Sequence, residues 1–157
     1  MKIKVIHYCW FGGNPLPKSA LKCIASWRKF FPDYEIKEWN ESNYDINKVP
    51  YMKEAYEAKK YAFVSDYARI DILYQYGGIY FDTDVEVIRP FDELLRRGGA
   101  FSGLEAGTID GFVRAQKKHK KSKFTHSRIG FCLAIGATKG FPFFKKILDV
   151  YQNLHLF

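Results

Sequence analysis

The chain has 157 residues, of which 47% are hydrophobic and 18% are aromatic, and its formal net charge is +8. This length predicts one domain with a substantial hydrophobic core, and the composition excludes a disordered or collagen-like protein. Every apolar stretch is shorter than the roughly 18 residues that a membrane-spanning helix needs. Because the first residues also lack the pattern of a secretion signal, we expect a cytoplasmic location.

The excess positive charge is confined to the C-terminal part of the chain. Residues 1–113 carry 15 Lys and Arg against 16 Asp and Glu, whereas residues 114–157 carry ten basic residues and one acid. The densest run is Arg114–Arg128, with seven Lys or Arg and no acid. Such a run is typical of a solvated loop or helix face, and the alternative is a specific site for a polyanion.

The cysteine pattern indicates thiols rather than a disulfide framework. Cys9, Cys23 and Cys132 are widely spaced, and none belongs to a CxxC pair. This spacing favours buried thiols in a reducing compartment over a zinc site or a redox-active pair.

The first forty residues predict a strand, a helix and a second strand. Lys2–Trp10 alternates and then becomes wholly apolar or aromatic, as a strand entering a buried sheet does. Pro17–Phe31 has hydrophobic residues at helical spacing, beginning with Leu21 and Ile24. Tyr34–Trp39 alternates again after a proline break. A β-α-β opening of this kind favours a parallel sheet covered by helices.

The middle of the chain predicts a polar loop over 40–49 that can close over a site, followed by two helices within 51–76. Gly77 and Gly78 end the second helix, and Ile79–Phe81 predicts a buried strand. Further along we expect a short helix over 90–95, a strand over 100–104 and a helix over 141–154. The chain is therefore expected to form a single α/β domain with a mainly parallel sheet flanked by helices.

Two acids, Asp82 and Asp84, follow the predicted strand and are separated by Thr83. In an extended chain, side chains two residues apart point to the same side, so both carboxylates can reach one point. Such carboxylates repel each other unless a cation lies between them, and all-oxygen ligands suit Mg²⁺ or Mn²⁺. An ion held there can neutralise a departing diphosphate. The alternative is a strand-end turn with solvated acids.

The helix before this strand carries a second charged pair, Asp66 and Arg69, three residues apart and hence on one face. They can form a surface ion pair that contributes less than about 1 kcal/mol to stability. Alternatively, the planar guanidinium of Arg69 can bind a phosphate or a sugar hydroxyl, and Asp66 can accept hydroxyl hydrogens. These residues by themselves leave both possibilities open.

Several segments resemble one enzyme family in the same order along the chain. Ser65–Val87, SDYARIDILYQYGGIYFDTDVEV, resembles the DxD-containing sugar-binding region of glycosyltransferases related to the yeast initiating α-mannosyltransferase and to bacterial capsular-polysaccharide transferases. Ile6–Pro17 and Ser26–Asn40 resemble the same family, so the similarity covers most of residues 1–95. The more distant glucosylating clostridial toxins share the Trp, the Asp and Arg on the helix, and the acid pair.

The resemblance implies a GT-A fold, which is Rossmann-like, and transfer of a hexose from a nucleotide diphosphate sugar with retention of anomeric configuration. The donor would be a UDP- or GDP-hexose. The acceptor would be a glycan or a lipid-linked molecule, in capsular, exopolysaccharide or lipopolysaccharide synthesis.

The same resemblance assigns roles by position. Asp82 and Asp84 would bind Mn²⁺ or Mg²⁺, and Asp66 and Arg69 would hold the donor sugar, which makes Asp66, Arg69 and Asp84 the implied catalytic residues. Tyr80 would line the same cleft, and Trp10 would stack on the nucleotide base. His7, on the first strand, is expected to be a core histidine with satisfied hydrogen bonds rather than a catalytic base.

The C-terminal part of the chain departs from the family pattern. Relatives usually continue with a segment that completes the donor and metal site, so we expect that part of the family domain to be missing and place the donor-binding core at about residues 1–104. The basic segment 114–128 follows where the fold places acceptor contacts, and we expect it to meet an anionic acceptor or the inner membrane surface. The residues assigned to this contact are Arg114, Lys117, Lys118, Lys120 and Lys121.

Two other functions remain to be weighed. A phosphatase of the haloacid dehalogenase type also places Asp-x-Asp after an apolar strand, but it carries the motif near the N-terminus and normally has Thr or Val where this chain has Glu86. A non-catalytic polyanion binder acting through residues 114–128 is the second alternative. No nucleic-acid partner is expected, because no known binding module is present and the basic run has few aromatic residues.

Overall fold

The computed structural model of the protein describes residues 3–91, 95–103 and 134–156. The elements within these ranges form one α/β domain around a five-stranded sheet. They are, in chain order, β1 (Val5–Cys9), α1 (Lys18–Phe30), β2 (Glu35–Trp39), α2 (Pro50–Glu57), α3 (Tyr61–Tyr76), β3 (Gly78–Phe81), β4 (Ala100–Ser102), β5 (Ala134–Ala137) and α6 (Pro142–Tyr151).

The sheet has the strand order β2-β1-β3-β5-β4 and is mixed. β1 pairs in parallel with β2 and with β3, as the β-α-β opening predicts. β5 pairs antiparallel with both β3 and β4, so the expectation of a mainly parallel sheet holds only for the first three strands. β5 has no clear signal in the sequence, because Ala134–Ala137 has only four residues and Ile135 is its one large side chain.

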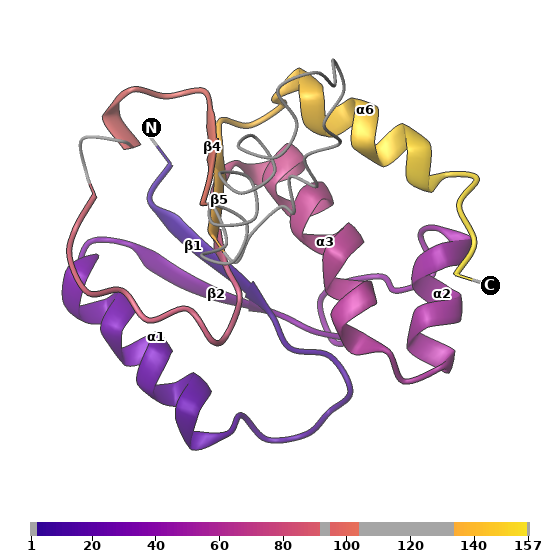
Figure 1. The fold of residues 1–157 in the computed structure, drawn as a ribbon, viewed down its shortest axis with the longest axis horizontal. Helices are drawn as coiled ribbons and strands as arrows, with labels where there is room; N and C mark the ends of the chain where they lie inside the picture. The colour runs from indigo at the N-terminus through magenta and orange to yellow at the C-terminus, as the bar shows by residue number, and fades with distance from the viewer. Residues whose placement is uncertain (1–2, 92–94, 104–133, 157) are drawn as a thin grey trace, which may run out of the picture.

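Helices cover both faces of the sheet (Figure 1). α1 lies on one face, and α3 lies on the other with α2 and α6 packed outside it. Along β3 the side chains alternate between the two sides: Ile79 and Phe81 pack in the core beneath α1, and Tyr80 packs in the core beneath α3. The α/β class with flanking helices is therefore confirmed.

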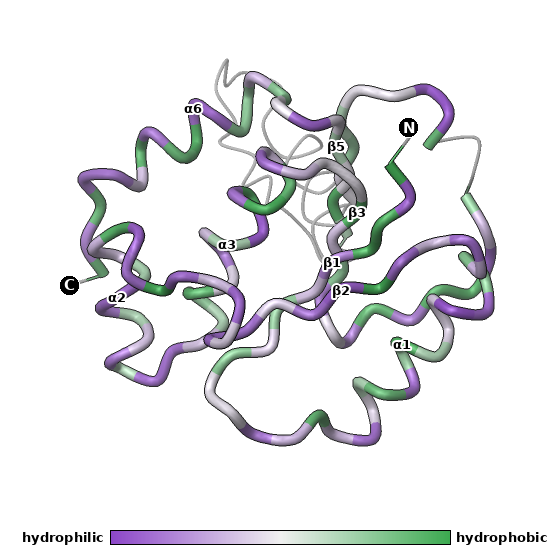
Figure 2. The backbone as a smooth tube through the Cα atoms, turned by 180° about the vertical axis from the view of Figure 1, so that it is seen from behind, coloured by the Kyte–Doolittle hydropathy of each residue, from purple (hydrophilic) through white to green (hydrophobic). Residues whose placement is uncertain are grey.

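The buried faces of α1 and α6 can be compared with the hydrophobic patterns that predicted these helices. α1 buries Ile24 as predicted, together with Trp27, but Leu21 is 52% exposed because Ala20 and Cys23 occupy the buried face instead. α6 buries Phe144 and Leu148, and Figure 2 shows hydrophobic and hydrophilic stretches alternating along this helix. The expected helix over 90–95 lies partly outside the described residues.

Gly77 and Gly78 let the chain pass from α3 directly into the centre of the sheet. Both have positive φ angles, 69° and 107°, which side chains other than glycine rarely adopt. A Cβ on Gly77 would lie 2.7 Å from the backbone nitrogen of Lys139, and one on Gly78 would lie 2.7 Å from the carbonyl oxygen of Val5. Because the backbones approach so closely here, β3 begins at Gly78, only two residues after the last residue of α3.

His7 is a core histidine with both ring nitrogens bonded, as predicted. Its side chain is buried, Nε2 donates to the carbonyl oxygen of Gly77 at 2.9 Å, and Nδ1 accepts from the indole nitrogen of Trp39 at 3.1 Å. These partners fix the neutral ring with its proton on Nε2. Burial lowers the pKa of His7, and the bond to Gly77 only partly opposes this effect.

Because the buried ring of His7 is neutral, the unfolding free energy of the wild type should depend on pH in a way that is lost in His7→Gln. As the pH falls below about 6.5, the unfolded chain protonates its histidine before the folded chain does, so the wild type loses stability relative to the variant. We expect the difference in unfolding free energy between the two chains, measured by urea denaturation, to narrow with a slope of at most about 1.4 kcal/mol per pH unit. A difference that stays constant or widens on acidification would contradict the neutral buried ring.

Candidate functional site

A pocket of about 410 Å³ opens where β1 and β3 end and α3 begins. The carboxyl ends of neighbouring parallel strands meet at this edge of the sheet, which is where α/β proteins commonly bind ligands. Trp10, Arg69, Asp82 and Asp84, all predicted from the sequence, line it together. The full lining comprises Trp10, Phe11, Asn14, Tyr61, Ala62, Ser65, Arg69, Asp82, Thr83 and Asp84.

The two acids reach the pocket through a turn and not through an extended strand. β3 ends at Phe81, and the amide of Val85 donates to the carbonyl oxygen of Asp82 at 3.1 Å, which closes a turn over the acidic triplet. Thr83 therefore also lines the pocket, whereas alternation in an extended chain would have turned it away from the two acids. Both carboxylates nevertheless lie on the same wall, as expected.

Arg69 joins the two motifs that the sequence placed on separate elements. Its guanidinium donates to Asp66 at 2.8 Å and to Asp82 at 3.2 Å, while its Nε donates to the carbonyl oxygen of Ser65. Only 8% of Arg69 is exposed, so the alternative of a solvated surface pair is wrong. A buried guanidinium held between carboxylates from a helix and a strand end is a fixed part of the site.

Burial and like charge disfavour ionisation of the carboxylates around Arg69. Burial raises the pKa of Asp82, and the nearby Asp84 adds to this effect, while Arg69 opposes it. Burial likewise raises the pKa of Asp66, again against the influence of Arg69. The pKa of Arg69 is raised despite its burial, because Tyr80 and the two carboxylates favour the charged guanidinium. Because Asp66, Asp82 and Asp84 outnumber the guanidinium of Arg69, these four residues carry a formal excess of negative charge.

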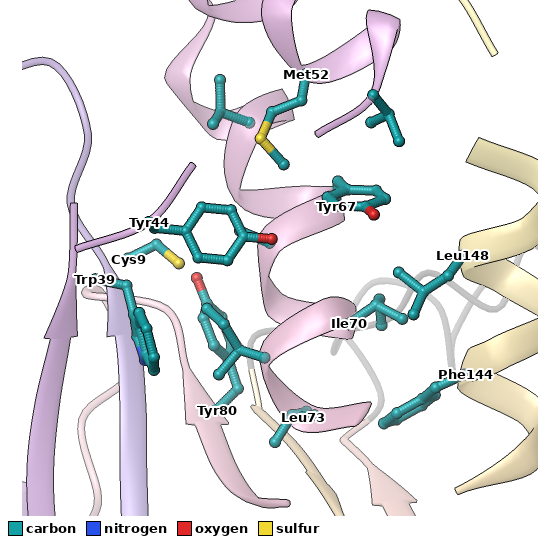
Figure 3. Close-up of a cluster of buried hydrophobic side chains, with 14 of the residues drawn as sticks. Cys9, Trp39, Tyr44, Met52, Tyr67, Ile70, Leu73, Tyr80, Phe144 and Leu148 are labelled. Carbon is teal, nitrogen blue, oxygen red and sulfur yellow. The ribbon is translucent and has the colours of Figure 1, made fainter. Parts of the chain in front are cut away.

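Tyr80 lies beneath the pocket and does not line it. Only 1% of the residue is exposed, and its ring packs under the guanidinium of Arg69 with a distance of 5.2 Å between the guanidinium carbon and the ring centroid. Figure 3 shows Tyr80 among the buried side chains between the sheet and α3, with its hydroxyl directed toward Cys9. The expectation that Tyr80 lines the cleft is thus corrected, because residues of β3 are covered on both faces.

Trp10 also lines the pocket, from a loop that is tied to its neighbours. Its indole nitrogen donates to the carbonyl oxygen of Asn14 at 2.6 Å, which leaves the ring half-exposed beside the pocket. The amide of Gly12 donates to Glu41 at 2.5 Å, and the ring of Tyr61 lies against Gly12 so closely that a Cβ there would overlap it. Sequence reasoning missed Tyr61, because its place against Gly12 depends on a tertiary contact between separate segments.

The polar loop over 40–49 is anchored on α3 through a buried carboxylate. Asp71 accepts from the hydroxyl of Tyr44 at 2.6 Å, from Lys48 at 2.5 Å and from Gln75 at 2.7 Å. The loop also supplies Glu41, which holds the Trp10 loop. The structure thus shows this segment as a fixed support of the pocket wall.

Cys9 and Cys23 are free thiols in the core, as predicted, and burial raises the pKa of Cys9 to about 12. Cys132 lies outside the described residues. So does the basic segment 114–128, whose assigned contact residues, Arg114, Lys117, Lys118, Lys120 and Lys121, stay predictions. None of the helices in the described ranges is long and apolar enough to cross a membrane.

Asp82 and Asp84 fit a partial ligand set for Mg²⁺ or Mn²⁺. Within the described part of the chain, no group of three or more His, Cys, Asp or Glu side chains is placed to hold a metal. However, these cations are often held by one or two carboxylates together with phosphate oxygens of the substrate. Two carboxylates beside an open pocket match that pattern.

The chain is similar in sequence to a known protein family and to two curated proteins. Residues 17–98 match the family described as glycosyltransferase sugar-binding region containing DXD motif. The chain is 33% identical over 158 residues to inositol phosphoceramide mannosyltransferase 3 of Schizosaccharomyces pombe, covering 98% of this chain and 37% of that protein. It is 30% identical over 144 residues to inositol phosphoceramide mannosyltransferase 1 of the same yeast, covering 78% of this chain and 44% of that protein.

The fold is also that of a solved glycosyltransferase. The structure described as PaToxG glycosyltransferase matches with a TM-score of 0.65 and 19% identity, over 94% of this chain and 59% of that chain. This similarity supports the GT-A-like fold. The chain spans less than half the length of the two yeast mannosyltransferases and less than two thirds of the solved glycosyltransferase chain. The family match over 17–98 contains Asp66, Arg69, Asp82 and Asp84, and the chain belongs to the family of glycosyltransferases with a DXD-containing sugar-binding region.

Proposed function

We propose that this chain binds a nucleoside diphosphate hexose in the pocket and transfers the hexose to an acceptor hydroxyl with retention of anomeric configuration. The observation that carries the proposal is the arrangement of Arg69, which is buried between Asp66 and Asp82 while Asp84 lies on the same pocket wall. Family membership supports glycosyl transfer as the reaction class.

The two walls of the pocket suit the two ends of such a donor. The half-exposed indole of Trp10 offers an aromatic face for the base, either uracil or guanine. Asp82 and Asp84, which line the same pocket, would hold Mn²⁺ or Mg²⁺. When bound, the ion neutralises charge on the diphosphate. Asp66 accepts hydrogens from sugar hydroxyls, and the fixed guanidinium of Arg69 donates to sugar or phosphate oxygens.

The reaction needs positioning and charge control more than a protein nucleophile. The bond between the anomeric carbon and the diphosphate oxygen breaks as the bond to the acceptor oxygen forms on the same face. The acceptor proton then passes to an oxygen of the departing phosphate. Arg69 stabilises the negative charge that develops on this leaving group, because it is already oriented by its carboxylate partners. A sugar trapped covalently on an Asp or Glu would contradict this step.

For the acceptor, the relatives favour a lipid carrying a sugar-like head group. Two of them bear the name inositol phosphoceramide mannosyltransferase, which describes transfer to a phosphoinositol lipid. We therefore favour mannose as the hexose and a lipid-linked hydroxyl as the acceptor, over an acceptor of capsular, exopolysaccharide or lipopolysaccharide synthesis. A reaction at the cytoplasmic face of a membrane agrees with the buried free thiols Cys9 and Cys23.

The alternatives have less support. Family membership disfavours a phosphatase of the haloacid dehalogenase type, and the acid triplet here forms a turn that faces a large open pocket. A polyanion-binding role would depend on residues 114–128, which lie outside the described residues.

The donor assignment predicts metal-dependent binding that requires Asp84. With Mn²⁺ present, a GDP- or UDP-hexose should raise the thermal midpoint of the wild-type chain, since a ligand that binds the folded state stabilises it. Asp84→Asn should abolish the shift without lowering the midpoint of the free chain, because Asp84 is exposed. Asp149→Asn, which changes an exposed acid on α6, is the matched control and should keep the shift. If no nucleotide sugar shifts the wild type, the donor assignment fails.

The role of Arg69 predicts that Lys cannot replace it. Lys keeps the charge but cannot donate to Asp66 and Asp82 in the planar geometry of a guanidinium. Arg69→Lys should reduce hexose transfer by about 10²-fold in kcat, the usual effect of losing one oriented donor to a developing charge. Steady-state kinetics with the donor that gives the largest thermal shift would measure it, and a variant with wild-type kcat would exclude a catalytic role for the guanidinium.

The acceptor proposal predicts transfer to an inositol lipid in vesicles. With the preferred donor and Mn²⁺, vesicles containing phosphatidylinositol should yield a lipid carrying one added hexose, detected by mass spectrometry. Vesicles of phosphatidylcholine alone should yield only slow release of free hexose by hydrolysis. Transfer that occurs with soluble oligosaccharides and not with phosphatidylinositol would contradict the lipid acceptor.

A further inference from the structure

The backbone that follows the acidic turn is held by side chains of α1 and not by the sheet. Between β3 and β4, residues 85–90 adopt neither helix nor strand, so their polar backbone groups need partners elsewhere. The indole nitrogen of Trp27 donates to the carbonyl oxygen of Val85 at 2.7 Å. The amide of Val87 donates to the hydroxyl oxygen of Ser26 at 2.9 Å. Two consecutive residues of one helix therefore clamp the segment.

Both members of the clamp are themselves fixed. Trp27 is fully buried, and its ring packs against Tyr8 and Phe81 with centroid distances of 5.7 and 5.2 Å. The hydroxyl of Ser26 donates to the carbonyl oxygen of Cys23 at 2.6 Å, which orients its lone pairs toward the amide of Val87. The clamped segment is anchored in turn, because Val87 is buried in the same core.

Asp84 depends on this clamp more than Asp82 does. Asp82 is held directly by Arg69 and follows a strand in the centre of the sheet. Asp84 is exposed, and its position is set by the turn from Asp82 to Val85. Val85, the last residue of this turn, is held by the hydrogen bond from Trp27. Lys22 also pairs with Glu86 at 3.1 Å, but this pair is exposed and contributes little.

The geometry points to Ser26 and Trp27 as positioning residues that set the place of Asp84 for the divalent cation. This inference rests on the proposed function, because it concerns the same carboxylate pair. Residues that orient metal ligands from behind typically change metal affinity by 10- to 100-fold when they are replaced. Because the clamp acts on Asp84 through the backbone, its loss leaves Asp66, Arg69 and Asp82 in place.

Trp27→Phe tests the inference, because it keeps most of the ring packing and removes the indole donor to Val85. Trp39→Phe is the matched control: it removes an equally buried indole bond, the one to His7, on a strand away from the acidic turn. Mn²⁺ affinity in the presence of GDP or UDP, measured by electron paramagnetic resonance, should fall about tenfold in Trp27→Phe and stay unchanged in Trp39→Phe. Ser26→Ala should show the same direction of change.

A second measurement is independent of any ligand. Hydrogen exchange of a peptide covering residues 82–88 should be faster in Trp27→Phe and in Ser26→Ala than in the wild type, and unchanged in Trp39→Phe. Wild-type Mn²⁺ affinity in Trp27→Phe, equal losses in both tryptophan variants, or unchanged exchange over 82–88 would each overturn the positioning role. A wild-type chain that binds no Mn²⁺ with either nucleotide would instead overturn the proposed function, whatever the exchange shows.

Discussion

The burial of Arg69 is the constraint on which the rest of the site depends. A guanidinium removed from water costs several kcal/mol unless its charge and its donors are matched. Here Asp66 matches it from the same helix, Asp82 from the end of β3, and the ring of Tyr80 packs beneath it. Because these partners come from two elements, the ion pairs hold α3 and β3 in one relative position. Arg69 nevertheless lines the pocket.

The link between α3 and β3 explains how one short stretch of chain carries most of the site. Gly77 and Gly78 turn the chain back so tightly that the carbonyl oxygen of Gly77 bonds His7 on β1. The helix thus delivers Asp66 and Arg69, and the strand that follows delivers Asp82, within a single helix-turn-strand unit. The other wall, around Trp10, arrives through β1, whose parallel pairing with β3 brings the ends of both strands to one edge.

Hydrophobic periodicity and the glycine pair, which are strong local signals, predicted α1, α2, α3, α6 and every strand of the sheet except β5. The roles of the charged residues were implied by the resemblance to the family and not by these patterns. The patterns failed where tertiary contacts decide. β5 has no periodic signal, since Gly136 is needed there to accommodate the ring of Phe101. The turn at Asp82 is closed by a backbone bond that residue types do not reveal. Tyr80 is buried because α3 covers its face of the sheet, and the clamp by Ser26 and Trp27 joins segments about sixty residues apart.

The charges at the pocket connect the structure to the proposed donor. Asp66, Asp82 and Asp84 bring three carboxylates to the guanidinium of Arg69, and burial raises the pKa of Asp82, with Arg69 opposing this effect and Asp84 adding to it. Among the described residues that line the pocket, a diphosphate would meet an excess of carboxylates and Arg69 as the one cationic partner. A divalent cation held by Asp82 and Asp84 would neutralise this formal excess of two negative charges. In the proposed function the acid pair therefore sets the order of binding, with the cation arriving before or together with the nucleotide sugar.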